Sequence, residues 1–149
     1  MRACLTHPLG GYYMSNDVFG AQGDFTTSPE ISQIFGELMG IWYVTQIQKR
    51  IQKGQKVQIV ELGPGRGTLM ADMVRTWSQL KGVTDAIDVI HLVEASPKLR
   101  EMQAQKLECI NVEVTPEGQK GITKSGIRVH WHEYLEEVPR GKTLLMGFN

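Results

Sequence analysis

The chain has 149 residues, of which 41% are hydrophobic and 21% are charged, and its 16 basic residues balance 16 acidic ones. This length and composition are typical of one globular domain with a real core. Because there is no basic surplus, we expect neither a nucleic-acid partner nor binding to an anionic membrane surface. No apolar run approaches the ~20 residues of a membrane span, so membrane insertion is not expected.

The N-terminal third predicts a loop followed by a long helix. Residues 10–27 contain four glycines and four aromatic residues, which indicates a loop packed over another part of the molecule. We expect the helix to begin at Ser28, which can cap it, with Pro29 and Glu30 in its first turn and Gly54 at its end. Its buried face is predicted from apolar residues at helical spacing: Ile31, Ile34, Phe35, Leu38, Ile41 and Trp42, followed by Ile47 and Ile51.

The remaining residues alternate between strand and helix patterns. The expected strands are Val57–Leu62, Ile87–Val93, residues 127–131 and residues 143–148, with helices from Thr68 to about Leu80 and from Pro97 onward, and a short turn or helix ending at Pro139. Residues 109–126 are not assigned beyond a small strand at Val112 and Val114. This alternation predicts an α/β fold with a mostly parallel sheet, in which the first strand lies beside the last.

The sequence Glu61-Leu-Gly-Pro-Gly-Arg-Gly-Thr68 lies between a predicted strand and a predicted helix. Such a turn exposes backbone N–H groups at a helix N-terminus, and glycine keeps side chains out of the way of a ligand. A dinucleotide fingerprint needs glycine where Thr68 stands, and a P-loop needs a Gly-Lys-Ser/Thr sequence that is missing. The Gly63, Gly65, Gly67 spacing, led by Glu61, is instead the pattern of enzymes that bind S-adenosylmethionine. A glycine turn without a ligand remains the alternative.

Glu94 follows the second predicted strand, where an acidic residue accepts hydrogen bonds from ribose hydroxyls in nucleotide-binding sheets. A solvated carboxylate is the alternative. Residues 23–32, which include Ser28 and Glu30, are explained by helix capping without any ligand. No nucleophile and base share a local signature, so no catalytic residue is assigned.

The cysteines and histidines give no further site. Cys4 and Cys109 form no C-x-x-C motif, and we expect two reduced thiols. His130 and His132 would share one face of a strand, but no third ligand with metal spacing is evident. No bound metal is therefore expected.

Several segments together resemble the MidA family of Rossmann-like methyltransferases, which occurs in bacteria and mitochondria. They are residues 11–13, residues 23–33 with Phe35-Gly36-Glu37, residues 60–69 and residues 92–97, while residues 121–127 are similar to the animal branch. The animal members are mitochondrial protein arginine methyltransferases that assist the assembly of respiratory complex I. The resemblance implies S-adenosylmethionine as cofactor, symmetric dimethylation of an arginine on a complex I core subunit, and a mitochondrial matrix location.

By this resemblance, residues 55–149 are the N-terminal half of the methyltransferase domain, and residues 1–54 pack on its cofactor site. Residues 24–30, with Ser28 and Glu30, should line that site, and the cofactor should be held by Glu61, Gly63, Gly65, Gly67, Thr68 and Glu94.

The resemblance also predicts that this chain is a fragment. Family members begin upstream with a targeting segment, whereas the first ten residues here have neither signal-peptide nor transit-peptide character. After the fourth strand the family has an acidic-aromatic block, where this chain reads Leu144-Leu-Met-Gly-Phe-Asn149. We therefore expect an incomplete, marginally folded and inactive sheet of four strands. A non-catalytic interaction module is the alternative function.

Overall fold

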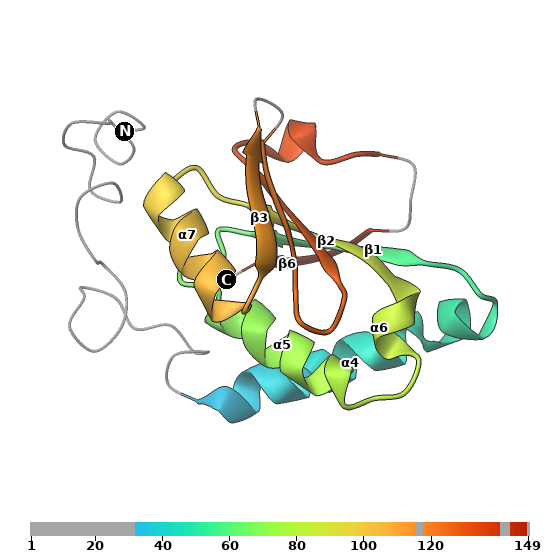
Figure 1. The fold of residues 1–149 in the computed structure, drawn as a ribbon. Coiled ribbons are helices and arrows are strands. Elements are labelled where there is room, and N and C mark those ends of the chain that lie inside the picture. Colours follow the sequence, from blue (N-terminus) through green and yellow to red (C-terminus); the bar gives the residue numbers. More distant parts are fainter. Residues whose placement is uncertain (1–31, 116–117, 141–143, 149) are drawn as a thin grey trace.

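The computed structural model describes residues 32–115, 118–140 and 144–148 (Figure 1). The expected loop at residues 10–27, the Ser28 cap, Glu30 and Cys4 lie outside the described residues. In chain order the elements are α4 (Gln33–Gln52), β1 (Val57–Leu62), α5 (Thr68–Ser78), α6 (Val83–Ala86), β2 (Ile87–Val93), α7 (Pro97–Lys106), β3 (Ile110–Thr115), β4 (Gly118–Ile122), β5 (Arg128–His132), the 3₁₀ helix η1 (Leu135–Glu137) and β6 (Leu144–Phe148).

All six described strands form one sheet in the order β3-β4-β5-β2-β1-β6. Strands β5, β2, β1 and β6 are mutually parallel neighbours, which confirms the predicted Rossmann-like α/β sheet. The bounds predicted for β1 and β2 are confirmed, and β5 begins one residue later than predicted. Strand β6 lies beside β1, as expected, and forms one end of the sheet.

The segment left unassigned in the sequence forms an antiparallel hairpin. Strand β3 pairs with β4, and β4 pairs antiparallel with β5, so the sheet is mixed at this end. The prediction of a single small strand here was therefore incomplete. Strand β4 contains Gly118 and Gly121, which have low strand propensity and obscured its pattern. Gly118 has a physical reason, because its φ is 120° and a Cβ there would lie 2.8 Å from the Trp131 carbonyl oxygen.

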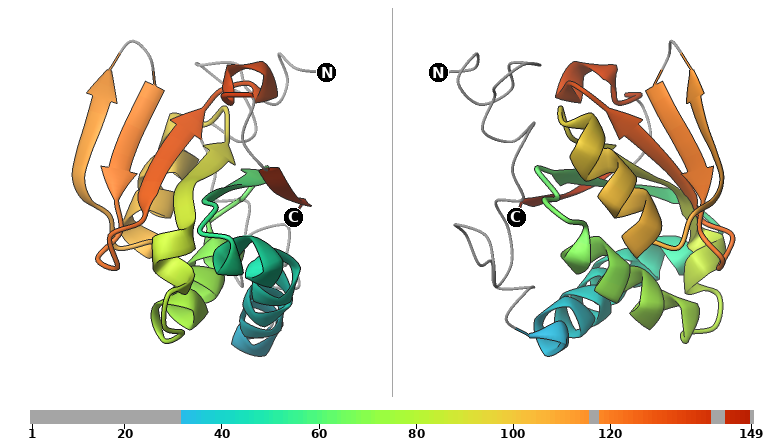
Figure 2. Two further views of the ribbon diagram at one scale, coloured as in Figure 1. Left: turned by 90° about the vertical axis from the view of Figure 1, so that its right-hand side faces the viewer. Right: turned by 60° about the vertical axis from the view of Figure 1, so that its left-hand side comes forward.

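Helices α4, α5 and α7 cover one face of the sheet (Figure 2). Trp77 of α5 and Trp131 of β5 are both almost completely buried in the core on this side. Since side chains alternate along a strand, Ile90 and Leu92 of β2 point to the helices, whereas His91 points to the opposite face. Both faces of the central strands are buried: His91 is only 1% exposed.

Most of the predicted buried face of the long helix was wrong. Ile34, Leu38 and Trp42 are 65%, 60% and 51% exposed, whereas Ile47 is buried as predicted. The residues that contact α5 are Gly36, Gly40 and Tyr43. A Cβ on Gly36 would lie 2.4 Å from the Cβ of Asp72, and the Gly40 carbonyl accepts a 2.9 Å hydrogen bond from the Trp77 indole. The two helices thus approach closely along the glycines.

Helix α4 begins at Gln33, and the Ser32 carbonyl accepts a 3.1 Å hydrogen bond from the Phe35 N–H. The predicted start at Ser28 lies outside the described residues.

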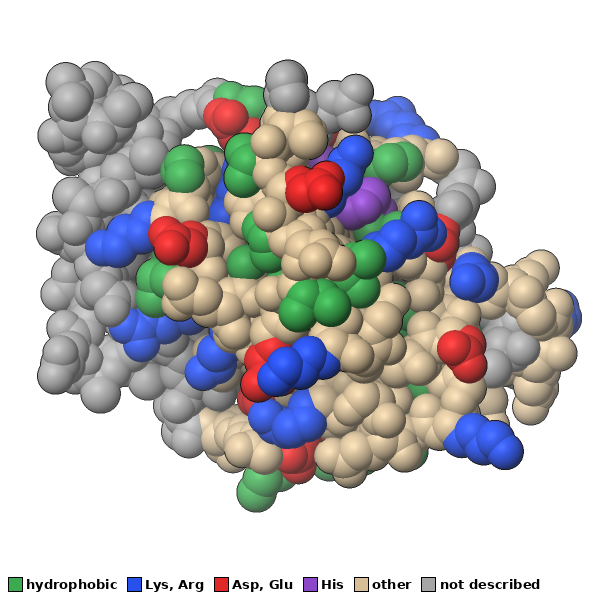
Figure 3. Space-filling view, viewed as in Figure 1, with side chains coloured by type: hydrophobic (Ala, Val, Ile, Leu, Met, Phe, Trp, Pro, Cys, Tyr) green, Lys and Arg blue, Asp and Glu red, His purple; other side chains and the backbone are tan. Residues whose placement is uncertain are grey.

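Charged side chains of both signs are interspersed over the face in Figure 3, among the residues drawn in colour. Within the described part of the chain, no helix combines the length and apolar character needed to cross a membrane.

We predict that Gly36→Ala destabilises the protein. Alanine has a higher helix propensity by ~1 kcal/mol, but its methyl group would push α4 away from Asp72 on α5, and such overpacking costs ~1–3 kcal/mol. Urea unfolding should show a net loss of up to ~2 kcal/mol. The exposed Gln48→Ala change on the same helix is the control and should leave stability within ~0.5 kcal/mol. A more stable Gly36→Ala variant would contradict the close approach.

Candidate cofactor site

The glycine turn connects the end of β1 to the start of α5. Gly63, Gly65 and Gly67 have φ angles of 62°, 53° and 80°, which lie in the left-handed region that favours glycine. The Gly63 N–H donates to the Val93 carbonyl over 3.1 Å, and the Gly67 N–H donates to the Pro64 carbonyl over 2.8 Å. These bonds tie the turn to the end of β2 and hold it at the N-terminus of α5.

The first and last glycines of the turn have different surroundings. A Cβ on Gly63 would meet no atom within 4 Å, so its backbone is open to approach. A Cβ on Gly67 would lie 3.1 Å from Cγ of Gln103, so this glycine lets α7 pack closely against the turn. Thr68 begins α5 and is half-buried.

Glu94 follows the last residue of β2 and lies close to the glycine turn. Its N–H donates to the His132 carbonyl over 2.8 Å, and its Oε1 accepts a 2.9 Å bond from the Ser96 N–H. Burial raises the pKa of the Glu94 carboxyl, against the opposing effects of the Ser96 N–H and the Arg100 charge. Arg100 also donates from Nε to the Glu94 carbonyl over 2.6 Å.

Gln103 on α7 is a site residue that the sequence analysis missed. Its Nε2 donates to the Gly65 carbonyl over 2.7 Å and lies 3.5 Å from Oε2 of Glu94. Its Oε1 accepts a 2.9 Å bond from the indole Nε1 of Trp131, and the residue is fully buried. One amide nitrogen therefore contacts both predicted parts of the site. A glutamine in a polar helix carries no distinguishing sequence signal, which is why it was missed.

Glu61 points toward the helices from β1. It is 1% exposed, and neither of its carboxylate oxygens accepts a hydrogen bond within the described part of the chain. Burial raises the pKa of this carboxyl to about 8. It lines a cavity of about 230 Å³ together with Tyr43 and Trp42, and its charge adds to burial in raising the pKa of Tyr43.

The glycine turn and Glu94 thus occupy the carboxyl ends of two neighbouring parallel strands. Chain order reverses here, because β1 has β2 on one side and β6 on the other. Ligands of open α/β sheets bind at such a switch point, outside the carboxyl ends of the strands. A larger groove of about 850 Å³ lies elsewhere, between α7 and the β3–β4 hairpin. The donors and acceptors converge at the turn, which makes it the candidate cofactor site. Ser28 and Glu30 lie outside the described residues.

The structure adds a third imidazole to the predicted histidine pair. His91 of β2 lies opposite His130 of β5, and its Nδ1 is 2.8 Å from Nε2 of His132. Burial lowers the pKa of both His130 and His132. For His130, the charge of Lys120 lowers the pKa further. Cys109 is a free thiol whose pKa burial raises to about 11, so it is protonated at neutral pH.

The carboxyl ends of β1 and β2, with the glycine turn and Glu94, indicate the class of the protein. A parallel sheet with a Gly-x-Gly-x-Gly turn after one strand and an acidic residue after its neighbour is the arrangement expected of a Rossmann-like methyltransferase. A family model described as "Putative S-adenosyl-L-methionine-dependent methyltransferase" matches residues 38–148. The chain belongs to this family, and the expected cofactor is the one that the family description names.

Curated relatives narrow the resemblance. The chain is 50% identical over 153 residues to "Protein arginine methyltransferase NDUFAF7, mitochondrial" of Rattus norvegicus, covering 99% of this chain and 35% of the relative. It is 48% identical to the Homo sapiens protein of that name over 153 residues, covering 99% and 34%. The Xenopus laevis protein is 48% identical over 147 residues, covering 95% and 33%. The chain therefore spans about a third of the length of these relatives.

A solved structure supports the fold. A COG1565 superfamily member from Burkholderia thailandensis, bound to S-adenosyl-homocysteine, superposes with a TM-score of 0.58 at 22% identity. The similarity covers 91% of this chain and 45% of that one.

We predict that Gln103→Leu lowers the free energy of unfolding by ~2–4 kcal/mol, because each buried polar group left without a partner costs ~1–3 kcal/mol. The groups affected are the Trp131 indole and the Gly65 carbonyl. Denaturant unfolding measures the change, and Gln105→Leu, on the exposed side of α7, is the matched control. Equal stability of the two variants would show that the amide contributes only volume.

Glu61 should make stability depend on pH. Its pKa is raised from 4.5 to about 8, so between these values the folded state holds a proton that the unfolded state has released. Stability should therefore fall as pH rises through this window, by up to ~1.4 kcal/mol per pH unit. Glu61→Gln should remove that fall. The measurement is urea unfolding of both proteins from pH 5 to 8, and parallel curves would show that Glu61 does not titrate there.

Proposed function

We propose that this chain forms the S-adenosylmethionine-binding part of a protein arginine methyltransferase. The observation that carries the proposal is the juxtaposition of the Gly63–Gly67 turn and Glu94, joined through the single amide of Gln103. In its favour, the arrangement matches the chemistry of the cofactor: open backbone at a helix N-terminus, and a carboxylate on the adjoining strand end. When bound, S-adenosylmethionine supplies an electrophilic methyl group for transfer to an arginine nitrogen.

Each predicted residue then has a role in binding. Gly63 and Gly65 let the ligand approach the backbone, and Thr68 begins the helix behind them. Glu94 accepts hydrogen bonds from the ribose hydroxyls, since its oxygens retain free acceptor positions beside the Ser96 N–H.

Glu61 is proposed to interact with the cationic end of the cofactor. Its oxygens accept no hydrogen bond within the described part of the chain, so a cation brought beside them would lower the raised pKa and restore a charged partner. Ser28 and Glu30 complete the proposed lining of the site.

The reaction, substrate and location are proposed for the whole protein to which such a chain would contribute. The relatives named above are called mitochondrial protein arginine methyltransferases, which supports a protein substrate and a mitochondrial location. We further propose symmetric dimethylation of an arginine on a complex I core subunit, in the matrix, on the resemblance described above.

Calorimetry tests cofactor binding directly. A protein that combines this chain with the remaining strands of the full-length relatives should bind S-adenosylmethionine and not NAD. Gly65→Val should abolish binding, since a branched side chain would occupy cofactor space and disfavour the positive φ. Gly54→Val is the matched control, because Gly54 has a φ of 66° with no atom near a Cβ and lies before β1, outside the turn. If Gly65→Val binds as tightly as Gly54→Val, the turn is not the cofactor site.

Glu94 gives a second, graded test. Glu94→Ala should weaken binding by ~1.5–3 kcal/mol, the value of hydrogen bonds to a charged group, and Glu94→Gln should lose less because one acceptor remains. Glu101→Gln, on the exposed side of α7, is the control. If both Glu94 variants bind S-adenosylmethionine as tightly as the parent, Glu94 is only a surface carboxylate. Radiolabelled methyl transfer to a peptide containing arginine, measured on a full-length relative and on this chain, then tests the reaction.

A further inference from the structure

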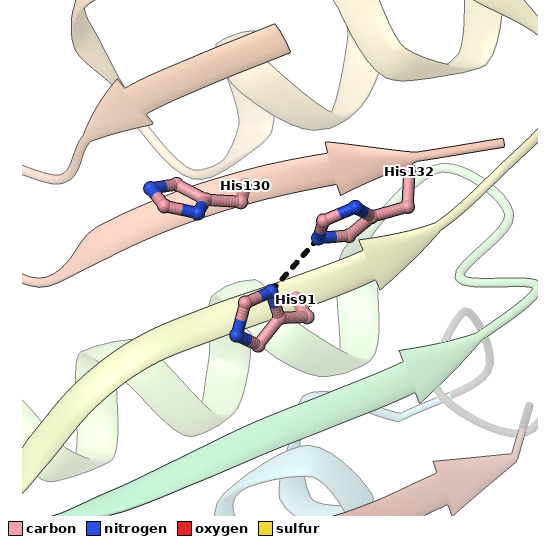
Figure 4. Close-up of side chains that lie close together, drawn as sticks. All are labelled: His91, His130 and His132. Carbon is pink, nitrogen blue, oxygen red and sulfur yellow. Dashed lines mark hydrogen bonds between the residues drawn. The ribbon is translucent and has the colours of Figure 1, made fainter. Parts of the chain in front are cut away.

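Three histidine side chains gather on the face of the sheet opposite α5 and α7 (Figure 4). His130 and His132 project from β5, two residues apart, and His91 projects from the neighbouring strand β2. One ligand nitrogen from each ring can be chosen so that all three lie within 4.8 Å of one another. The sequence showed only the pair on β5, because the third member lies 39 positions before His130 and is brought there by the parallel pairing of the strands.

We propose that His91, His130 and His132 form a binding site for a divalent transition-metal ion, with Zn²⁺ as the best-matched ion. An all-imidazole set suits zinc, copper and nickel, whereas magnesium and calcium require oxygen ligands. Three protein ligands leave the fourth tetrahedral position to water or another small ligand, as in zinc sites built from three histidines. The proposal is independent of cofactor binding.

The spacing of the rings is compatible with coordination after small side-chain rotations. Tetrahedral zinc with bonds of about 2.1 Å places its ligand nitrogens about 3.4 Å apart. The His91 Nδ1 and His132 Nε2 atoms, at 2.8 Å, would separate slightly, and the wider pairs, at no more than 4.8 Å, would close. Without a metal, the 2.8 Å contact is a hydrogen bond whose donor depends on the tautomers of the two rings. That bond needs only two histidines, and it gives no role to the ring of His130.

The surroundings favour a defined site over a loose surface cluster. His91 and His132 are 1% and 8% exposed, and both stand on central strands of the sheet. His130 is half-buried, so the cluster is accessible to solvent on its side. The charges facing the cluster are mixed. Lys120 pairs with His130 across β4 and β5, while Arg128 forms an ion pair with Asp88.

Near His132, the charges that act on the ring are those of Glu137, Arg100 and Lys120. The cation thus meets both attraction and repulsion, so affinity depends on the three imidazoles and not on a general negative field.

Zinc titration of the metal-free, full 149-residue chain tests the proposal. Isothermal calorimetry should give one equivalent of Zn²⁺, and the melting temperature should rise with zinc. His130→Ala and His132→Ala should each weaken binding by about tenfold or more. His7→Ala is the matched control: it removes the fourth histidine of the sequence and should bind like the parent. Equal affinity of the parent and His130→Ala would overturn the proposal.

Co²⁺ absorption of the unmodified chain decides the case even if a histidine variant fails to fold. Tetrahedral bands without a sulfur-to-cobalt charge-transfer band are expected, and the Cys4→Ser/Cys109→Ser double variant should give the same spectrum. A charge-transfer band that disappears in the double variant would assign the metal to the thiols and overturn the site. Absence of tetrahedral bands would show that the cluster is only a hydrogen-bonded histidine pair.

Discussion

The candidate site depends on the side-chain amide of Gln103, which connects three elements from inside the core. The Trp131 indole can only donate a hydrogen bond, so the Gln103 atom that faces it must be the oxygen. The amide nitrogen is therefore directed toward the Gly65 carbonyl and the Glu94 carboxylate. In this way β5 sets the orientation of an amide on α7, and that amide positions both the turn after β1 and the acid after β2.

Close backbone approach makes this arrangement possible, and glycine provides it in two places. Gly67 has no side chain to meet Gln103, so α7 can lie against the turn and its glutamine can reach Gly65. Gly36 and Gly40 do the same for α4, which approaches α5 until the Trp77 indole reaches the Gly40 carbonyl. Helix α5 is thus held in two places: the glycine turn fixes its N-terminus, and α4 packs along its side.

These contacts explain which predictions from the sequence succeeded. Strands β1 and β2 are mostly apolar segments bordered by turn residues, and both of their faces are buried, so each segment stands out from the polar residues around it. The long helix was predicted as a helix, but its buried face was assigned to its large apolar residues. The real contact is made by Gly36 and Gly40, and a hydrophobicity pattern assigns no weight to glycine.

The residues missed at the site share a different cause. Gln103 and His91 are polar residues whose roles depend on contacts far apart in the sequence, with Gly65 and Trp131 for the first and His132 for the second. Motifs detect residues that act together within a short segment. Glu94 was found because it ends a recognisable strand, whereas nothing local distinguishes His91 from any other residue inside one.

The carboxyl ends of β2 and β5 connect the opposite faces of the sheet. The Glu94 N–H donates to the carbonyl of His132, so the acid of the candidate cofactor site and one histidine of the cluster share a backbone hydrogen bond. The His132 side chain points away from the helices, while Trp131, one residue earlier, points toward them and orients Gln103. Alternation along β5 therefore places a core contact and a histidine ligand next to each other. A metal held by the three rings would move His132 slightly away from His91, beside the strand ends that hold Glu94 in place.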